Sequence, residues 1–395
     1  MKLNIAFYTD TYLPAVDGVV NSILNFKKEL ERRGHSVYIF GTYNISSGRG
    51  DNRRKGHDRD VFLYPGVRFK PYPQYSMALF PYNSISKLSR LNIDIIHAHT
   101  PFFMGFAGLI SSMLANYPII GSYHTMLNNR AVVSSYYPKN KQLKRLTSKY
   151  MLMYIKFFYK RCNITAAPSG AIRDMLMGYG IGNVMVVPNG IDTKFFNPNT
   201  DGHSVRKGLG ISGREKVVLY VGRLGREKKL EVLLRAARRI LGKRNDVKFL
   251  IAGAGPAGEY YKGMAARLGV SEKVHFMGYV TRNMLPKVYA ASDLFCMPST
   301  FETQGMVALE AMASGKPVVA ADSLALSELV RDLKNGEKFI PGDYIDCAKK
   351  IEKVLNNSDS YIRETVKTAK EFSIAKTTDR LLDAYKLSFT PKAID

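Results

Sequence analysis

The sequence predicts an α/β protein built from two doubly wound parallel sheets. Short apolar runs alternate with helical patterns along the whole chain, and these runs fall into two sets of six. The chain has 395 residues, which exceeds what one hydrophobic core usually supports. A segment rich in Pro, Gly, Asn and Asp, residues 188–214, separates the two sets. We therefore expect two α/β domains.

The expected strands are short runs rich in β-branched and aromatic residues. They are Leu3–Thr9, Ser36–Thr42, Ile93–His97, Ile119–Tyr123, Ile164–Ala167 and Val184–Val187 in the first half, and Val217–Val221, Val247–Ile251, Val274–Met277, Leu294–Met297, Val318–Ala321 and Lys338–Ile340 in the second. The expected domains are residues 1–188 and 189–372, and a terminal helix in 373–395 should pack back toward the first domain. Because parallel sheets bind ligands beyond the carboxyl ends of their strands, we expect a ligand cleft between the domains.

One charge-free stretch, residues 101–129, resembles a membrane span in composition. Pro118 interrupts it, so we expect a buried helix near residues 102–115 followed by a strand. The first ten residues contain Lys2 and Asp10 and no apolar run, which is unlike a secretory signal. The three cysteines are widely spaced, which is typical of a reducing cytoplasm rather than of a disulfide framework or a zinc site.

The net charge of +25 is unevenly distributed. Residues 1–180 contain 24 Lys and Arg against 9 Asp and Glu, and no acidic residue lies between Pro101 and Arg173. Nucleic acid, an anionic membrane and phosphorylated substrates are the partners that such a charge suits. No nucleic-acid recognition motif with interleaved aromatic and basic residues is present, so a basic nucleic-acid-binding protein is a distant alternative.

The segment 299–322 contains the most informative pattern. Glu302 follows an expected strand, and Gly305 and Met306 open a helix whose free N–H groups and positive dipole end suit a diphosphate. Glu310 lies more than one turn inside that helix, where a carboxylate is suited to accept hydrogen bonds from a ribose diol. Helix-start and solvent-facing acids would give the same pattern, so the two glutamates alone leave both interpretations open.

A second pattern follows the strand Val217–Val221. Gly222 allows close backbone approach, and Arg223 and Lys228 place two cations at the carboxyl end of the strand. Fixed cations suit a pyrophosphate leaving group, which gains negative charge in the transition state. A solvated basic loop is the alternative.

Two further candidates lie in the first half of the chain. Gly18 stands where the chain enters its first long helix and would let backbone approach a ligand. His124 closes an expected strand, at a position suited to a cleft edge, although a lone histidine is more often structural.

Taken in order along the sequence, these segments resemble glycosyltransferase family 4 over nearly the whole chain. The resemblance rests on the Glu-x7-Glu spacing and on seven motifs in order, TDTYLPAVDGV, AHTPF, SYHT, PSG, VPNGID, GRL-x-x-EK and AGAGP. It implies the GT-B fold, in which two Rossmann-like domains face each other across a cleft. It also implies transfer of a hexose from a nucleotide-diphosphate sugar with retention of anomeric configuration, and no cofactor besides the donor substrate.

The resemblance assigns a role to each matching residue. Gly18 would lie against the donor phosphates, and His124 would contact the transferred sugar or support the reacting centre. Arg223 and Lys228 would bind the diphosphate. Family members often have Gly-Gly where Asp17-Gly18 stands, which weakens the assignment of Gly18.

The two glutamates receive separate roles from the resemblance. Glu302 would bind the sugar hydroxyls and Glu310 the ribose. No metal site is implied. The sequence Asp58-Arg59-Asp60 imitates the D-x-D of metal-dependent transferases, but it lies in a basic, glycine-rich loop and is interpreted as surface. Epimerases and phosphorylases of the same fold are alternatives that the Glu-x7-Glu segment disfavours.

The acceptor is expected to be a lipid at an anionic membrane surface. On a helical wheel of residues 139–161, one side carries the apolar and aromatic side chains of Leu143, Leu146, Tyr150, Met153, Tyr154, Phe157 and Phe158. The other side carries the cations Lys141, Lys144, Arg145, Lys149, Lys156 and Lys160, and Arg161 is the exception. The motifs ETQG, TDTYLP and SYHT resemble the glycolipid-forming branch, including diacylglycerol glucosyltransferases with a UDP-glucose-like donor. The expected location is cytoplasmic and peripheral to the membrane. The alternatives are a core-facing helix and a GDP-mannose-dependent or other hexosyltransferase with a soluble acceptor.

Overall fold

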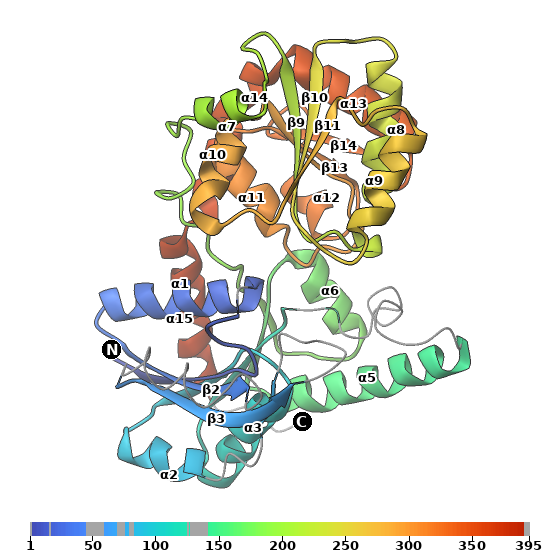
Figure 1. Cartoon of the computed structure of the whole chain (residues 1–395). Helices are drawn as coiled ribbons and strands as arrows, with labels where there is room; N and C mark the ends of the chain where they lie inside the picture. The colour runs from blue at the N-terminus through green and yellow to red at the C-terminus, as the bar shows by residue number, and fades with distance from the viewer. Residues whose placement is uncertain are drawn as a thin grey trace. The chain divides into compact units, whose positions relative to one another are not determined.

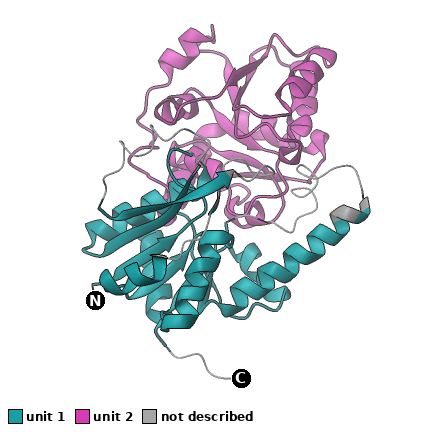
Figure 2. Ribbon diagram, turned by 60° about the horizontal axis from the view of Figure 1, so that its bottom comes forward, with its two compact units in different colours: residues 1–190, 374–395 teal, residues 191–373 magenta. Residues whose placement is uncertain are grey.

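The computed structural model describes residues 2–15, 17–44, 59–68, 76–78, 83–124, 126 and 141–390. The chain forms two compact units, coloured separately in Figure 2. Unit 1 contains residues 1–190 together with 374–395, and unit 2 contains residues 191–373. The sheet of unit 1 is mostly parallel and that of unit 2 is parallel, and each has helices on both faces, so the expected α/β class with two doubly wound domains is confirmed.

Unit 1 contains an eight-stranded sheet in the order β4-β3-β2-β1-β5-β6-β7-β8, in which only β4 is antiparallel. Its strands are β1 Asn4–Tyr8, β2 Ser36–Asn44, β3 Val61–Arg68, β4 Ser76–Ala78, β5 Ile95–Ala98, β6 Ile119–Ser122, β7 Ile164–Ala167 and β8 Val184–Val186. The expectation of six strands was wrong here. The strand β3 was missed because Pro65-Gly66 interrupts its alternating pattern of apolar and polar residues. The strand β3 nevertheless pairs in register with its neighbour β2. Most of the basic, glycine-rich loop that contains Asp58 lies outside the described residues.

The helices of unit 1 cover both faces of this sheet (Figure 1). They are α1 Gly18–Arg32, α2 Asn83–Arg90, α3 Phe103–Ala115, α5 Lys141–Arg161, α6 Gly170–Gly178 and α15 Ile374–Ser388. Helices α1 and α15 share one core with alternate residues of the central strands, such as Phe7 and Ile120. Tyr8, which points to the other face, packs at Gly108 of α3.

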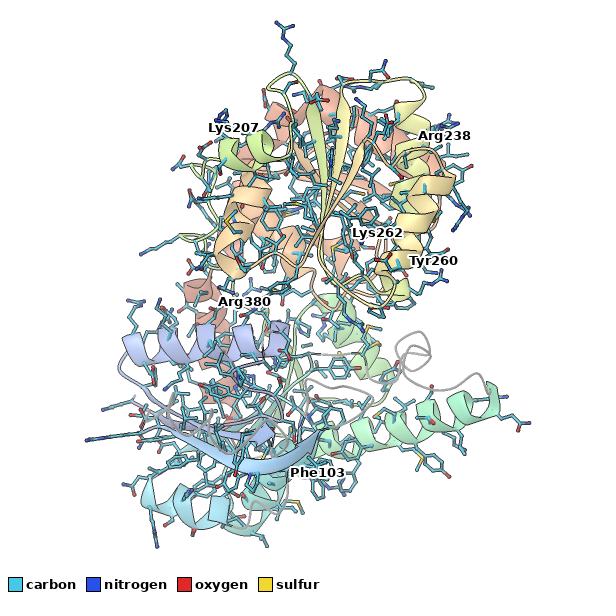
Figure 3. The ribbon with its side chains drawn as sticks, in the orientation of Figure 1. Phe103, Lys207, Arg238, Tyr260, Lys262 and Arg380 are labelled. Carbon is cyan, nitrogen blue, oxygen red and sulfur yellow. The ribbon has the colours of Figure 1, made fainter. Side chains whose placement is uncertain are left out.

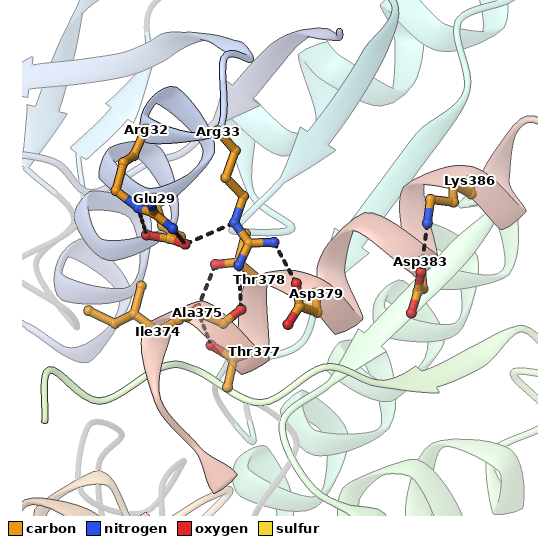
Figure 4. A network of polar contacts seen from close by, with 10 residues as sticks. All are labelled: Glu29, Arg32, Arg33, Ile374, Ala375, Thr377, Thr378, Asp379, Asp383 and Lys386. Carbon is orange, nitrogen blue, oxygen red and sulfur yellow. Dashed lines mark hydrogen bonds and ion pairs between the residues drawn. The ribbon is translucent and has the colours of Figure 1, made fainter. Parts of the chain in front are cut away.

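Polar contacts hold α15 against α1, although the two helices are far apart in sequence (Figure 4). The guanidinium of Arg33 donates to the carboxylates of Glu29 and Asp379 and to the carbonyl oxygen of Ala375. The hydrogen bond from Arg32, together with that from Arg33, lowers the pKa of Glu29 to about 2, although partial burial acts in the opposite direction. The last helix of the chain is therefore part of unit 1.

Unit 2 contains a six-stranded parallel sheet in the order β11-β10-β9-β12-β13-β14. Its strands are β9 Lys216–Val221, β10 Val247–Ala252, β11 Val274–Gly278, β12 Leu294–Met297, β13 Val318–Ala321 and β14 Gly336–Phe339. All six strands expected from the sequence are present. The helices are α7 His203–Gly208, α8 Leu230–Leu241, α9 Gly258–Arg267, α10 Leu285–Ala290, α11 Met306–Ala313, α12 Ala325–Leu329, α13 Tyr344–Asn356 and α14 Ser358–Glu371.

Helix α3 has the expected bounds, but the expectation of a buried helix was wrong for one of its faces. Phe103, Phe106, Ile110, Met113 and Leu114 are exposed, while the opposite side, with Met104 and Leu109, is buried. Among the described residues, no helix is long and apolar enough to span a bilayer.

Substituting Gly105 with Ala should destabilise unit 1 by about 3 kcal/mol. A Cβ at this position would lie 1.8 Å from the carbonyl oxygen of Thr100, so the first turn of α3 would have to move away from β5. The matched control is Gly178→Ala in α6, where no atom lies within 4 Å of the added Cβ. Thermal unfolding of both variants tests this, and equal melting temperatures would contradict it.

Candidate active site

Two loops of unit 2 bring the predicted cation and carboxylate together. Lys228 follows β9 and Glu302 follows β12, and these strands are neighbours in the sheet although they are distant in sequence. Because parallel neighbours end at the same edge, their loops meet there. The ammonium of Lys228 donates a hydrogen bond to Glu302 Oε1 at 2.7 Å.

The electrostatics of this pair keep both groups charged. Burial alone would raise the pKa of Glu302, but the charge and hydrogen bond of Lys228, with a hydrogen bond from Ser299, hold it below its ordinary value. Burial would lower the pKa of Lys228, but Glu302 raises it. The side chain of Lys228 is 26% exposed and that of Glu302 is 13% exposed, so a ligand can still reach them. A polar ligand could therefore replace either charged group as the hydrogen-bond partner of the other.

The other predicted cation, Arg223, lies at the same edge of the sheet. It is 46% exposed and forms an ion pair with Glu227 at 3.2 Å. Arg226 stacks on the ring of Tyr260, labelled in Figure 3, at 3.4 Å from its centroid. Lys229 adopts a left-handed conformation with φ 55°, a region of backbone space that favours glycine.

Helix α11 begins as the sequence indicates. Gly305 has φ +83°, and Met306 is the first helical residue. A Cβ at Gly305 would also lie 2.9 Å from Leu326 Cδ2, so both conformation and space favour glycine. The first turn of α11 contains no acidic side chain that would neutralise its dipole.

Glu310 has a partner that sequence reasoning missed. The hydroxyl of Tyr289, on α10, donates to Glu310 Oε2 at 2.8 Å. Burial raises the pKa of Glu310 to about 7, although this hydrogen bond and the charge of Arg282 lower it. Tyr289 is fully buried. No local pattern marks it, because its pairing with Glu310 depends on how α10 packs beside α11.

In unit 1, the predicted phosphate contact lies at the first turn of α1. Asp17 caps this helix, because its Oδ1 accepts from the N–H of Val20 at 2.8 Å, and its Oδ2 accepts from Thr11 Oγ1. No atom lies within 4 Å of the position where a Cβ of Gly18 would stand. The backbone at Gly18 is therefore open on that side.

Substituting Gly18 with Ala should leave unit 1 folded, since the added methyl group meets open space. If donor phosphates approach this backbone, the methyl group should raise the donor KM about tenfold, equivalent to ~1.4 kcal/mol. Thermal unfolding and initial-rate kinetics test the two halves separately. An unchanged KM would contradict the role of Gly18.

His124 is half-buried and lies at the end of a line of histidines whose other two members, His97 and His99, are buried. Its Nε2 is 3.4 Å from Nδ1 of His99, and the two rings are nearly parallel. The rings of His99 and His97 stack with centroids 4.0 Å apart. Burial lowers the pKa of His124 to about 4 and that of His97 to about 3. These imidazoles are therefore neutral near pH 7, so each has one ring nitrogen that donates and one that accepts hydrogen bonds.

His97, His99 and Tyr385 were not predicted as site residues, although His99 belongs to the AHTPF motif. Nδ1 of His97 is 2.8 Å from the hydroxyl of Tyr385 on α15, and its Nε2 is 2.8 Å from Ser122 Oγ. His97 and His99 alternate at the end of β5, which is the one local signal for their shared side. The anchor from α15 is a tertiary contact.

Asp10, in the TDTYLP motif, has a structural role. Its Oδ1 accepts from the N–H of Met104 at 2.9 Å, and its Oδ2 accepts from Thr100 Oγ1. Burial raises its pKa to about 7 despite these hydrogen bonds. It thus links the end of β1 to the start of α3.

No group of three or more His, Cys, Asp or Glu side chains that could hold a metal ion occurs within the described ranges. Asp58 of the D-x-D sequence lies outside those ranges, and Asp60 is in the turn before β3.

Two family models match the chain in succession. Glycosyltransferase Family 4 matches residues 16–195, and Glycosyl transferases group 1 matches residues 203–373. An alpha-monoglucosyldiacylglycerol synthase of Streptococcus pneumoniae is 32% identical over 346 residues, covering 85% of this chain and 75% of that protein. The chain belongs to glycosyltransferase family 4. The resemblance drawn from the motifs is confirmed, and the protein is a glycosyltransferase.

Other similar proteins differ in what their names describe. A GDP-mannose-dependent alpha-mannosyltransferase of Corynebacterium glutamicum is 29% identical, covering 85% of this chain and 76% of that protein. Anabaena HepE, solved with UDP and glucose, matches the fold with a TM-score of 0.73 at 20% identity, covering 97% of this chain and 99% of HepE. The GT-B fold of this family 4 glycosyltransferase is thereby confirmed.

Proposed function

We propose that this family 4 glycosyltransferase transfers a hexose, with retention of configuration, from a UDP-glucose-like donor to a lipid acceptor of the diacylglycerol type. The observation that carries the donor half is the Lys228–Glu302 contact at the edge of the sheet of unit 2. In the proposal, the ammonium of Lys228 binds the diphosphate, and the carboxylate of Glu302 beside it accepts hydrogen bonds from sugar hydroxyls.

In this proposal the side chains of unit 2 act on the donor. Arg223 and Lys228 stabilise the charge that develops on the leaving diphosphate, and the helix start at Gly305 and Met306 supplies N–H groups to it. Glu302 orients the sugar and Glu310 accepts the ribose hydroxyls. In unit 1, Gly18 admits the phosphates and neutral His124 supports the reacting centre through hydrogen bonds.

Bond exchange proceeds on one face of the sugar. The bond between the anomeric carbon and the diphosphate oxygen breaks, the acceptor oxygen forms the new bond, and the leaving phosphate takes the acceptor proton. The protein contributes position and electrostatic stabilisation rather than an attacking side chain.

The lipid acceptor is supported by the relative named as a monoglucosyldiacylglycerol synthase. The second candidate is a GDP-mannose-dependent or other transferase with a soluble sugar acceptor, which the Corynebacterium relative supports. A thermal-shift screen with UDP-glucose and GDP-mannose, followed by transfer to diacylglycerol in mixed micelles or to soluble sugars, separates the two. NMR of the product gives its anomeric configuration. Transfer only to soluble acceptors, or an inverted product, would overturn the proposal.

Activity should survive chelation of divalent ions. The cations Arg223 and Lys228, with the start of α11, are proposed to stabilise the diphosphate, so a metal has no required role there. We expect rates in excess EDTA within about twofold of those with Mg²⁺, a difference of less than ~0.5 kcal/mol. A strict requirement for Mg²⁺ or Mn²⁺ would contradict this prediction and return attention to Asp58 and Asp60.

A further inference from the structure

Helix α3 presents a row of large apolar side chains to solvent. Phe103, labelled in Figure 3, is 49% exposed, and Met113 and Leu114 are 63% and 71% exposed. With Phe106 and Ile110 they fall within about 100° of the helix circumference at about 100° per residue. The buried residues of α3 take the opposite side. Because the helix has no charged residue, nothing on this face interrupts the apolar row.

Helix α5 carries a second row. Leu146, Tyr150, Met153 and Phe157 are 42–59% exposed and fall within about 60° of its circumference. Ile155, Phe158 and Tyr159 lie on the opposite side and are buried. In Figures 1 and 2 the amino-terminal half of α5 extends away from the sheet of unit 1. The apolar residues that the sequence groups on one side of α5 therefore do not share one environment. Phe158 packs in the core, whereas the row from Leu146 to Phe157 is exposed.

The two rows meet through an aromatic contact. The ring centroids of Phe106 and Phe157 are 6.4 Å apart. Together the nine exposed side chains of both helices form what we call the α3–α5 surface. An exposed apolar area shared by two helices is unusual in a soluble protein and marks an interaction site.

Charge selects the kind of partner. Arg145, Lys149 and Lys160 are exposed, and with Lys156 they flank the apolar row of α5 along one side. No acidic residue occurs anywhere between Pro101 and Arg173. Apolar side chains edged by cations alone match the acyl boundary and anionic headgroups of a bilayer.

A second copy of the chain fits this surface less well. A symmetric contact would place the same patch on both partners, so the cations of one α5 would face those of the other. Like charges brought together with no acidic residue to separate them oppose such a dimer.

We propose that the α3–α5 surface is the membrane-docking surface of this transferase, with both apolar rows in the acyl boundary and the cations of α5 at anionic headgroups. The proposal rests on the lipid acceptor of the proposed function. It goes beyond it by assigning docking to two helices, one of which has no charge at all.

Sedimentation with vesicles of phosphatidylcholine, with or without half phosphatidylglycerol, tests the proposal. We expect the full chain to bind the anionic vesicles at low salt at least tenfold more strongly than neutral ones. Leu114→Glu and Met153→Glu should each weaken binding at least tenfold. The matched control is Ile340→Glu in unit 2, which alters a side chain that is 63% exposed and should change binding less than twofold. Lys149→Gln should weaken binding about fivefold.

Each alternative has its own result. Failure of the full chain to bind anionic vesicles, or equal loss in Ile340→Glu, would overturn the proposal. A dimer in sedimentation velocity that Leu114→Glu dissociates, without vesicle binding, would identify a second copy as the partner and also overturn it. Transfer to diacylglycerol in micelles, measured in parallel, keeps the tests distinct: vesicle binding without lipid transfer would remove the proposed acceptor and leave the docking surface.

Discussion

Replacing Lys228 with Met is expected to lower kcat/KM by roughly 30- to 1000-fold, equivalent to ~2–4 kcal/mol of transition-state stabilisation. The variant removes a cation from the proposed leaving group and also leaves the partly buried carboxylate of Glu302 without its 2.7 Å partner. Arg223→Ala should lose a charge-assisted contact of similar size. Initial rates at varied donor concentration measure both effects.

The matched control for Lys228→Met is Lys229→Met. Lys229 is the next residue and is 46% exposed, and its only described ion pair is a long contact of 3.9 Å with Glu231. Its loss should change kcat/KM less than threefold. If Lys228→Met and Arg223→Ala both turn over within tenfold of the parent, the assignment of these residues to the diphosphate is wrong.

The second large effect separates the two glutamates. Glu302→Gln should reduce kcat/KM about 100-fold, or ~2.7 kcal/mol, because the sugar loses a charged hydrogen-bond acceptor. Its affinity for UDP should be unchanged or higher, since Lys228 is released from the ion pair. Glu310→Gln should weaken UDP binding itself about tenfold. Calorimetry with UDP and kinetics with the donor measure the two variants.

The pH dependence of donor binding gives an independent test of Glu310. Its pKa is raised to about 7 by burial, and a ribose diol donates best to the ionised carboxylate. Protons must therefore leave on binding at low pH, so affinity should rise about tenfold from pH 6 to pH 8 and then level off. UDP-glucose is the suitable ligand because its diphosphate does not titrate in this range. The same slope in Glu310→Gln, or equal loss of UDP affinity in both glutamate variants, would contradict the division of roles.

The sequence alone predicted most of the local structure. Alternating apolar runs located all six strands of unit 2, and Gly305 marked the start of α11 because a left-handed residue before a helix favours glycine. The motifs also placed the chain in its family. Where a local rule was broken, as by Pro65-Gly66 inside β3, the prediction failed, because pairing with β2 outweighs the weak propensity of the segment.

Tertiary structure decided which residues meet. Lys228 and Glu302 are 74 positions apart, and their contact depends on β9 lying beside β12. Tyr289 and Glu310 likewise meet only through tertiary packing. So do His97 and Tyr385, which are 288 positions apart in the sequence. No periodicity of 2.0 or 3.6 residues carries information over such separations.

The two helices of the docking surface show the same division. The sequence predicted both helices, and for α5 the spacing of its residues also predicted one apolar side. It did not determine which apolar side chains are buried, because that depends on where each helix packs against the sheet: Phe158 lies in the core of unit 1, whereas Phe157, its neighbour in the chain, is 42% exposed. Local sequence sets the pattern of a helix, and the packing of distant segments sets which part of that pattern faces solvent.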